Sequence, residues 1–206
     1  MQPEPCGPAA VPPDNRAAVP PTALPTTTAG ARGLDATGTN LGTSLFDDIT
    51  VTGSDEGGLS MSNTTGTTTF GDGTGTDLAL TTTSGIGPAF QLSNAGTVNV
   101  GAGGTDDFSA TGGPAVDVTG TSEVSLAFDN VSSTNSSTDG INLAGLGTGA
   151  FSATGGAITG AADIGFDIDG GSSSVSYSGA LNNGTGQTAE ITGRTGGTVT
   201  LSGAIA

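Results

Sequence analysis

The sequence contains no His, no Lys and no Trp, and its single cysteine is Cys6. Without His or Lys, the chain has neither a Ser-His-Asp or Cys-His catalytic arrangement nor a phosphate loop of the Walker type. A lone cysteine excludes an intrachain disulfide and a structural zinc site, which takes Cys and His ligands. We therefore expect no catalytic residues and no cofactor.

Basic residues are also scarce, since three Arg face 19 acidic residues and give a formal net charge of −16. A protein that binds DNA or RNA uses Lys and Arg to displace counterions from phosphates, and an anionic membrane surface attracts the same residues. No apolar run approaches the ~20 residues that span a bilayer. We expect no nucleic-acid partner and no membrane insertion by this segment.

Proline is concentrated at one end, with eight of the ten prolines before residue 26. Proline is excluded from helix interiors and from inner strands. Residues 1–32 are therefore predicted to form a Pro- and Ala-rich disordered tail or linker, ahead of one domain at 33–206. Residues 1–25 lack the basic start and apolar core of a secretory signal, although abundant Thr, Ser, Gly and Asp are typical of exported bacterial proteins.

A repeat is visible from Gly33 onward. Its first element is an apolar–polar–apolar triplet followed two residues later by Asn or Gly, as in Leu59-Ser60-Met61-Ser62-Asn63. The separations between successive triplets are 25, 31, 26, 25, 25 and 23 residues. Such a spacing is typical of a solenoid or another stacked array. The triplets start at Leu34, Leu59, Phe90, Val116, Ile141, Phe166 and Ala189.

Two further elements follow each triplet. The second element alternates apolar and polar residues, which is the period of a strand, and the third is a single apolar residue. A propeller blade needs ~40 residues, and sandwich hairpins do not repeat at this spacing. We therefore predict an all-β fold, a right-handed parallel β-helix with three short strands per ~25-residue coil and about seven coils. The alternating copies are Val98-Asn99-Val100, Val124-Ser125-Leu126, Val175-Ser176-Tyr177 and Val199-Thr200-Leu201, and the single apolar residues are Ile49, Leu78, Phe108, Val131, Ile158, Leu181 and Ile205.

Runs such as Ala189-Glu190-Ile191-Thr192-Gly193 and Gly196-Gly197-Thr198-Val199-Thr200-Leu201 resemble the Thr- and Gly-rich repeats of bacterial right-handed parallel β-helix proteins. These are autotransporter passengers and adhesin-like exoproteins, whose coils share the pectin lyase-like fold. The resemblance covers residues 33–206 and implies an extracellular or cell-surface location and a role in attachment or display. The expected partners are a surface ligand or adjacent coils of a longer chain, because the sequence stops partway round a coil.

The same fold also hosts polysaccharide lyases and hydrolases, so a fragment of such an enzyme is the alternative function. The resemblance implies that a lyase needs an acidic calcium cluster and a basic proton acceptor, for which Arg194 is the candidate. A glycosidase needs two carboxylates at a defined separation, and no such pair stands out. Trp is absent and the only tyrosine, Tyr177, is predicted to point inward, so a sugar-stacking surface is lacking. We predict a non-catalytic scaffold.

One group of acidic residues is predicted at a corner of the solenoid. The run Gly73-Thr74-Gly75-Thr76-Asp77-Leu78 resembles the core of Ca²⁺-binding nonapeptide repeats, but it occurs once, and Asp72 replaces the first Gly. Asp106 and Asp107 are expected at the corresponding corner of the next coil. Ca²⁺ takes about six to eight oxygen ligands, so these carboxylates are candidate calcium ligands. The alternative is that they are turn residues.

A second group is expected on the outward face of the first strand, where Asp117, Asp167 and the nearby Asp169 lie among other polar residues. These three are also candidate ligands for Ca²⁺. The alternative is an ordinary solvated strand face.

Overall fold

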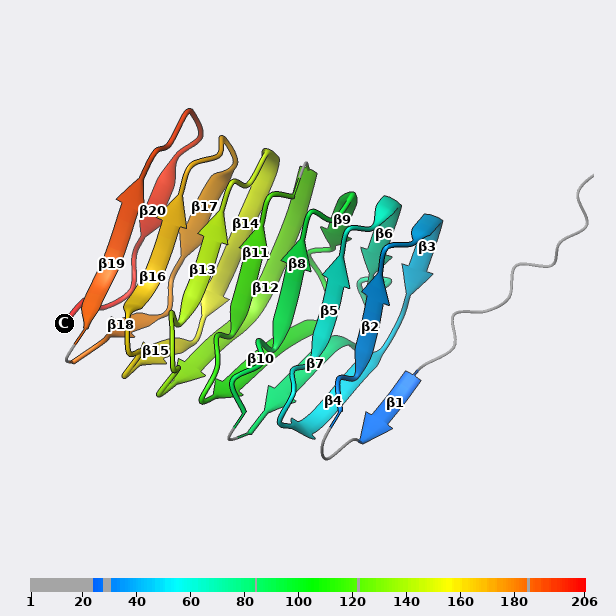
Figure 1. The fold of residues 1–206 in the computed structure, drawn as a ribbon, viewed down its shortest axis with the longest axis horizontal. Helices are drawn as coiled ribbons and strands as arrows, with labels where there is room; N and C mark the ends of the chain where they lie inside the picture. The colour runs from blue at the N-terminus through cyan, green and yellow to red at the C-terminus, as the bar shows by residue number, and fades with distance from the viewer. Residues whose placement is uncertain (1–23, 28–30, 84, 122, 185) are drawn as a thin grey trace, which may run out of the picture.

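The computed structural model of the chain describes residues 24–27, 31–83, 85–121, 123–184 and 186–206. In these residues the regular structure is entirely β, and parallel sheets wind into a solenoid of about seven turns, here called coils (Figure 1). No helix of the described residues has the length and apolar character needed to cross a membrane. The all-β class, the parallel pairing and the number of coils are as predicted.

The first face of the solenoid is a seven-stranded parallel sheet in which each strand pairs with the equivalent strand one coil away. The predicted triplets lie in register, with Leu34 opposite Leu59, Leu59 opposite Phe90, and so on to Phe166 opposite Ala189. Coils of different length keep this register because the extra residues are placed at the corners. The strands are β2 (Leu34–Thr37), β5 (Leu59–Ser62), β8 (Phe90–Ser93), β11 (Val116–Thr119), β13 (Ile141–Ala144), β16 (Ile164–Asp169) and β19 (Gln187–Thr192).

The turn after each first-face strand uses a residue in the left-handed conformation. Asn63 has φ 51°, Asn94 has φ 49° and Gly120 has φ 63°. Asn and Gly are the residues that adopt this conformation at low cost. The Asn side chains also stack, since Asn94 Nδ2 donates to Asn63 Oδ1 at 3.4 Å. The repeated Asn or Gly of the sequence therefore marks the end of the first face.

The second and third faces belong to one thirteen-stranded sheet. They are joined because β12 (Glu123–Thr134) runs through the corner between them without interruption. The second-face strands are β3 (Asn40–Phe46), β6 (Thr65–Phe70), β9 (Thr97–Val100), β14 (Thr148–Gly155), β17 (Ser174–Tyr177) and β20 (Val199–Leu201), and those of the third face are β1 (Leu24–Thr27), β4 (Ile49–Ser54), β7 (Thr76–Thr82), β10 (Thr105–Thr111), β15 (Ala157–Thr159) and β18 (Ala180–Asn182).

The alignment of the second-face strands differs from the prediction. The sequence repeat aligns Val175 with Val124, but Val175 pairs with Phe151, and Phe151 pairs with Leu126. The last two coils are therefore shifted by two residues from the predicted register. An alternating strand shows the same pattern after a shift of two, so its period identifies the inward side but not the register.

The third-face residues are shifted in the same way. Leu78 pairs with Ile49 as predicted, but Phe108 pairs with Leu80 and with Val131. The sequence predicts that the single apolar residues of the third face stack in one column along the axis. In the structure they fall into three separate columns, offset from one another along the strands.

The structure places one strand, β1, within the predicted tail of residues 1–32. Residues 1–23 of the predicted tail lie outside the described residues. Strand β1 pairs in parallel with β4, so the sheet begins before residue 33. Pro25 lies in this strand, which is at the edge of the described sheet, the position where a strand tolerates proline.

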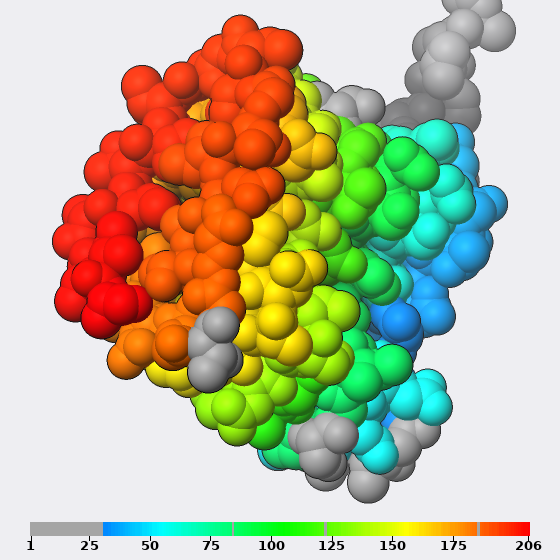
Figure 2. All heavy atoms as spheres, turned by 60° about the vertical axis from the view of Figure 1, so that its left-hand side comes forward, coloured from blue at the N-terminus to red at the C-terminus, as the bar shows by residue number. Residues whose placement is uncertain are grey.

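The winding of the coils is right-handed. In Figure 1 the first-face strands run upward nearest the viewer, the second-face strands run downward behind them, and successive coils advance from right to left. This is the usual hand for crossovers between parallel strands. Figure 2 turns the C-terminal end forward and shows the last coil, in red and orange, as the outer layer of the stack.

Inward side chains form a buried apolar column along the axis. Its middle is a chain of aromatic rings whose centroids lie 4.5–6.3 Å apart. Tyr177 points inward, as predicted, and its hydroxyl donates to the carbonyl of Val131 at 2.9 Å. All seven Phe and the single Tyr of the sequence belong to this column, which contains Phe46, Phe70, Phe90, Phe108, Phe128, Phe151, Phe166 and Tyr177.

Candidate functional site

The corner between the second and third faces carries an acidic cluster over the first coils. In these coils a short irregular segment separates the second-face strand from the third-face strand at this corner. Asp47 and Asp48 join β3 to β4, residues 71–75 join β6 to β7, and residues 101–104 join β9 to β10. The irregular corners bring acidic residues of neighbouring coils close together, whereas the next coil passes straight through in β12.

Asp47, Asp72 and Asp77 form the centre of this cluster. One carboxylate oxygen from each lies within 4.8 Å of the others, and no other trio of acidic or cysteine side chains in the described part of the chain meets this spacing. Asp77 is buried, Asp47 is partly buried and Asp72 is exposed. The three side chains link two consecutive coils, and we call them the corner triad.

The loop that carries Asp72 is shaped by glycine and by hydrogen bonds to carboxylates. Gly71 and Gly73 have φ of 78° and 83°. Asp72 Oδ1 accepts hydrogen bonds from the Thr74 amide at 2.9 Å and the Thr74 hydroxyl at 2.7 Å. Asp77 Oδ2 accepts one from the Gly73 amide at 3.1 Å. The loop therefore wraps around the carboxylate of Asp77.

Two glycines leave space for Asp77. A Cβ at Gly71 would lie 2.3 Å from the Asp77 carboxyl carbon, and one at Gly104, a coil further along, would lie 2.6 Å from Asp77 Oδ2. Asp77 Oδ1 has no hydrogen-bond partner although it is buried, and the same is true of Asp47 Oδ1. Burying a carboxylate oxygen without a hydrogen-bond partner lowers the stability of the folded state.

Electrostatics penalise the ionised triad. Burial raises the pKa of Asp77, the hydrogen bond from Gly73 opposes this rise, and the charges of Asp72, Asp47 and Asp48 add to it. The pKa of Asp47 is also raised, by loss of solvent and by the charges of Asp72 and Asp48. In this arrangement the carboxylates repel one another, and a bound cation would reverse the sign of that interaction.

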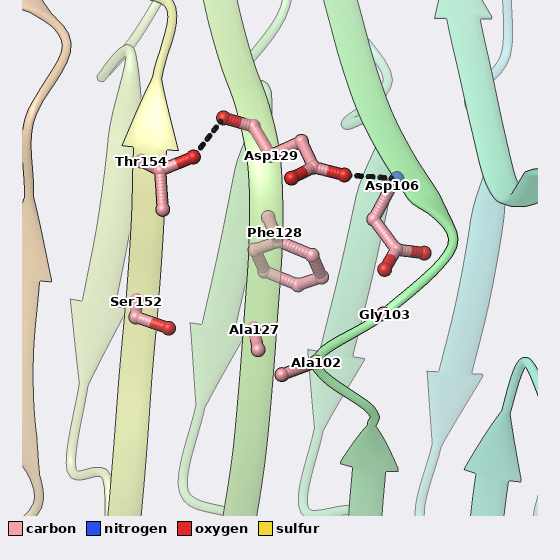
Figure 3. A pocket seen from close by; sticks show the side chains of 8 residues that line it. All are labelled: Ala102, Gly103, Asp106, Ala127, Phe128, Asp129, Ser152 and Thr154. Carbon is pink, nitrogen blue, oxygen red and sulfur yellow. Dashed lines mark hydrogen bonds between the residues drawn. The ribbon is translucent and has the colours of Figure 1, made fainter. Parts of the chain in front are cut away.

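Asp106 lies at the same corner one coil further along. It is 2% exposed, and its Oδ1 has no partner. Burial, followed by the charges of Asp77 and Asp129, raises the pKa of Asp106 to about 7. Its amide donates to Asp129 Oδ2 at 3.1 Å (Figure 3). Beside it is a pocket of about 150 Å³, lined by Ala102, Gly103, Asp106, Ala127, Phe128, Asp129, Ser152 and Thr154.

The remaining candidate ligands do not converge. Asp107 accepts a hydrogen bond from Asn130 Nδ2 at 2.7 Å. Asp117 accepts amide hydrogen bonds from both neighbouring coils, from Gln91 at 3.2 Å and from Asn142 at 2.9 Å. These carboxylates are therefore already paired with neutral donors.

Asp167 and Asp169 lie on β16, two rows beyond Asp117 along the first face. Asp169 Oδ1 accepts from the Thr192 hydroxyl at 3.0 Å. Asp167 Oδ1 has no partner, and burial, followed by the charges of Asp139 and Glu190, raises the pKa of Asp167 to about 6. The structure thus brings Asp72 and Asp77 together and leaves the first-face carboxylates separate.

Three acidic residues of the corner, Asp47, Asp48 and Asp129, are absent from the sequence-based ligand set. Asp47 follows Phe46 and precedes Ile49, so aligning the corners of successive coils, rather than only the strands, would have found it. Asp129 gives no such signal because it lies in the middle of β12, where the sequence shows no turn.

Arg194, the candidate proton acceptor of a lyase, is bound to backbone carbonyls. Its Nη1 donates to Gly170 at 2.7 Å, and its Nη2 donates to Gly196 at 2.9 Å and to Ser173. The guanidinium therefore braces turns of the last two coils.

The comparisons with known proteins found no match to a family model, to a curated protein or to a solved structure.

Proposed function

We propose that the chain is a non-catalytic structural and interaction module, a rigid stalk or adhesive surface displayed on the outside of a bacterial cell. The resemblance of its repeats to those of autotransporter passengers and adhesin-like exoproteins with a pectin lyase-like fold supports this proposal. The parallel solenoid agrees with that resemblance at the level of architecture.

The observation that carries the proposal is that outward polar side chains pair along the solenoid axis. On the first face, the Ser60 hydroxyl donates to Gln91 Oε1 at 3.2 Å, and Gln91 in turn donates to Asp117. Asn142 continues this ladder from the next coil. Such a network rigidifies a surface, which suits a display surface better than an active site.

Two further observations make the enzyme alternative less attractive. Each of the eight aromatic residues contacts at least one other ring in the central column, and only Phe46 among them is not fully buried. The described surface therefore lacks the exposed ring on which a sugar stacks. Arg194 donates hydrogen bonds to three backbone carbonyls of the last two coils, so its guanidinium is engaged with the backbone and is poorly placed to act on a substrate.

Surface location can be tested by protease treatment of intact cells that express the tagged full gene product in its source organism. We expect the tag signal to be lost from intact cells while a cytoplasmic control protein persists. Protection of the tag until the cells are lysed would contradict the proposal.

The absence of catalysis is tested separately by incubating the purified chain with polygalacturonate and alginate. We expect no unsaturated sugar product from the native chain or from Arg194→Ala. Product formation that is lost in Arg194→Ala would favour the lyase instead.

A further inference from the structure

We propose that the corner triad is a calcium site, in which Asp47, Asp72 and Asp77 bind one Ca²⁺ and connect the first two coils. This inference does not depend on where the chain is displayed, because it is based on the geometry of the corner alone.

The spacing of the three carboxylates fits a single ion. Calcium–oxygen bonds are about 2.4 Å long, so two ligands of the same ion lie at most about 4.8 Å apart. One oxygen each of Asp47, Asp72 and Asp77 satisfies that limit. Asp47 lies in the loop between β3 and β4, Asp72 lies in the loop between β6 and β7, and Asp77 is the second residue of β7. The two loops lie side by side because β3 and β6 are paired neighbours.

A second observation points to a ligand at this place. Asp77 has no exposed surface and its Oδ1 has no hydrogen-bond partner. Glycine at positions 71 and 104 makes room for this carboxylate, and the Gly73 amide binds only its other oxygen. A buried carboxylate oxygen is ordinarily hydrogen-bonded or solvated, and an ion bound between the three carboxylates would give Asp77 Oδ1 its missing partner.

The donor set favours calcium over other metals. All three side-chain ligands are hard carboxylate oxygens, whereas Zn²⁺ and Cu²⁺ prefer imidazole or thiolate. Ca²⁺ accepts irregular geometry and completes its sphere with water, whereas Mg²⁺ requires a near-ideal octahedron. Asp72 is exposed and lies in a glycine-rich loop, which allows water to reach the ion.

The direct test is thermal melting and calorimetric titration of the full chain after treatment with a chelator. We expect CaCl₂ to raise the Tm by about 3–6 °C when free Ca²⁺ is ten times its Kd. MgCl₂ at equal ionic strength should raise it less. Because weak extracellular calcium sites have Kd near 10⁻³ M, the absence of a calcium-specific shift at about 10 mM would overturn the proposal.

Substitution separates the site from general charge screening. Asp77→Asn retains an oxygen for the Gly73 amide but removes the buried charge, so it should abolish the calcium-specific shift while its Tm in chelator equals or exceeds that of the native chain. Glu123→Gln is the matched control, since Glu123 is exposed on β12 and its loss changes the net charge equally. The proposal is wrong if Asp77→Asn keeps the full calcium response.

A second variant covers the case in which Asp77→Asn does not fold. Asp72→Asn alters an exposed residue and leaves an oxygen to accept from Thr74. We expect it to weaken calcium binding at least tenfold. If Asp72→Asn binds calcium as tightly as the native chain, Asp72 is not a ligand and the proposed three-residue site is wrong.

Hydrogen exchange gives a local measurement of the same event. Calcium should slow exchange of the amides in residues 46–49 and 71–77, with no change in the last two coils. Uniform slowing along the whole solenoid would indicate screening of the net charge and would count against a site.

Discussion

Asp167 shows how a single carboxylate on the first face couples stability to pH. It lies between Asn142 and Glu190, and burial together with the charges of Asp139, Glu190, Asp169 and Asp163 raises its pKa from 3.8 to about 6. Because the folded-state value is the higher one, the stabilising contribution is complete below pH 4 and is lost as pH rises through 6.

Asp167→Asn should therefore raise the Tm at about pH 7.5 by about 2–4 °C, corresponding to about 1 kcal/mol for a partly solvated group, and should have little effect near pH 4. Melting curves at the two pH values measure this difference. Glu123→Gln is the control, since it removes an exposed charge on β12 that is not among the charges raising the pKa of Asp167. A loss of stability in Asp167→Asn at pH 7.5 would contradict the argument.

Gly149 tests the close approach of neighbouring coils. Its φ is 109°, and a Cβ there would lie 1.8 Å from the carbonyl oxygen of Val124. We expect Gly149→Ala to lower the free energy of unfolding by about 2–3 kcal/mol and the Tm by about 5–10 °C. Gly101→Ala is the control, because nothing lies within 4 Å of its Cβ position, and it should change stability by less than about 0.5 kcal/mol. Equal effects of the two substitutions would contradict this reading.

At this scale the sequence predicts part of the candidate site. Asp72 and Asp77 are recognisable because a glycine-rich motif surrounds them, and Asp106 follows by its place in the next coil. Asp47 belongs to a different loop, and only the stacking of coils brings it to Asp77. Residues that meet across coils without sharing a motif are not visible in one coil's sequence.

Among the elements, the first-face strands are the ones that sequence predicts in register. Each is followed by an Asn or Gly turn, and that turn is a fixed reference point for alignment. The second- and third-face strands have only alternation, so their predicted positions are wrong by two residues in places. The sequence predicts two elements where the structure has the single strand β12. The buried, inward residues of this strand are even-numbered up to Phe128 and odd-numbered from Val131, so the alternation shifts by one residue while the strand continues.

Phe128 of this long strand contacts three other aromatic rings of the core, as many as Phe90 does. Its ring centroid lies 4.5 Å from that of Phe108 and 5.7 Å from those of Phe90 and Phe151. We expect Phe128→Ala to lower the free energy of unfolding by about 3–5 kcal/mol, measured by urea denaturation.

Phe46→Ala is the comparison for this prediction. Phe46 is only partly buried and its one ring contact is with Phe70 at 5.6 Å, so we expect a loss of about 1–2 kcal/mol. If the two substitutions are equally destabilising, the stability of the column is not concentrated at Phe128.

For the whole molecule, charge is the property that composition predicts most directly. A net charge of −16 on one solenoid is self-repulsive, and added salt shortens the range of that repulsion from about 10 Å at 0.1 M to about 3 Å at 1 M. We expect the Tm in 1 M NaCl to exceed that in 0.1 M NaCl, as measured by circular dichroism. A lower Tm in the more concentrated salt would show that attractive ion pairs outweigh the repulsion.

The corners of the solenoid vary in length while the first face keeps its spacing. Consecutive first-face strands start 23 to 31 residues apart in sequence, yet each pairs directly with the next. Each coil consequently adds a constant length of about 4.8 Å along the solenoid axis. A foreign peptide grafted into a chosen corner would project at a height known in advance, and two such grafts would be held at a separation set by counting coils.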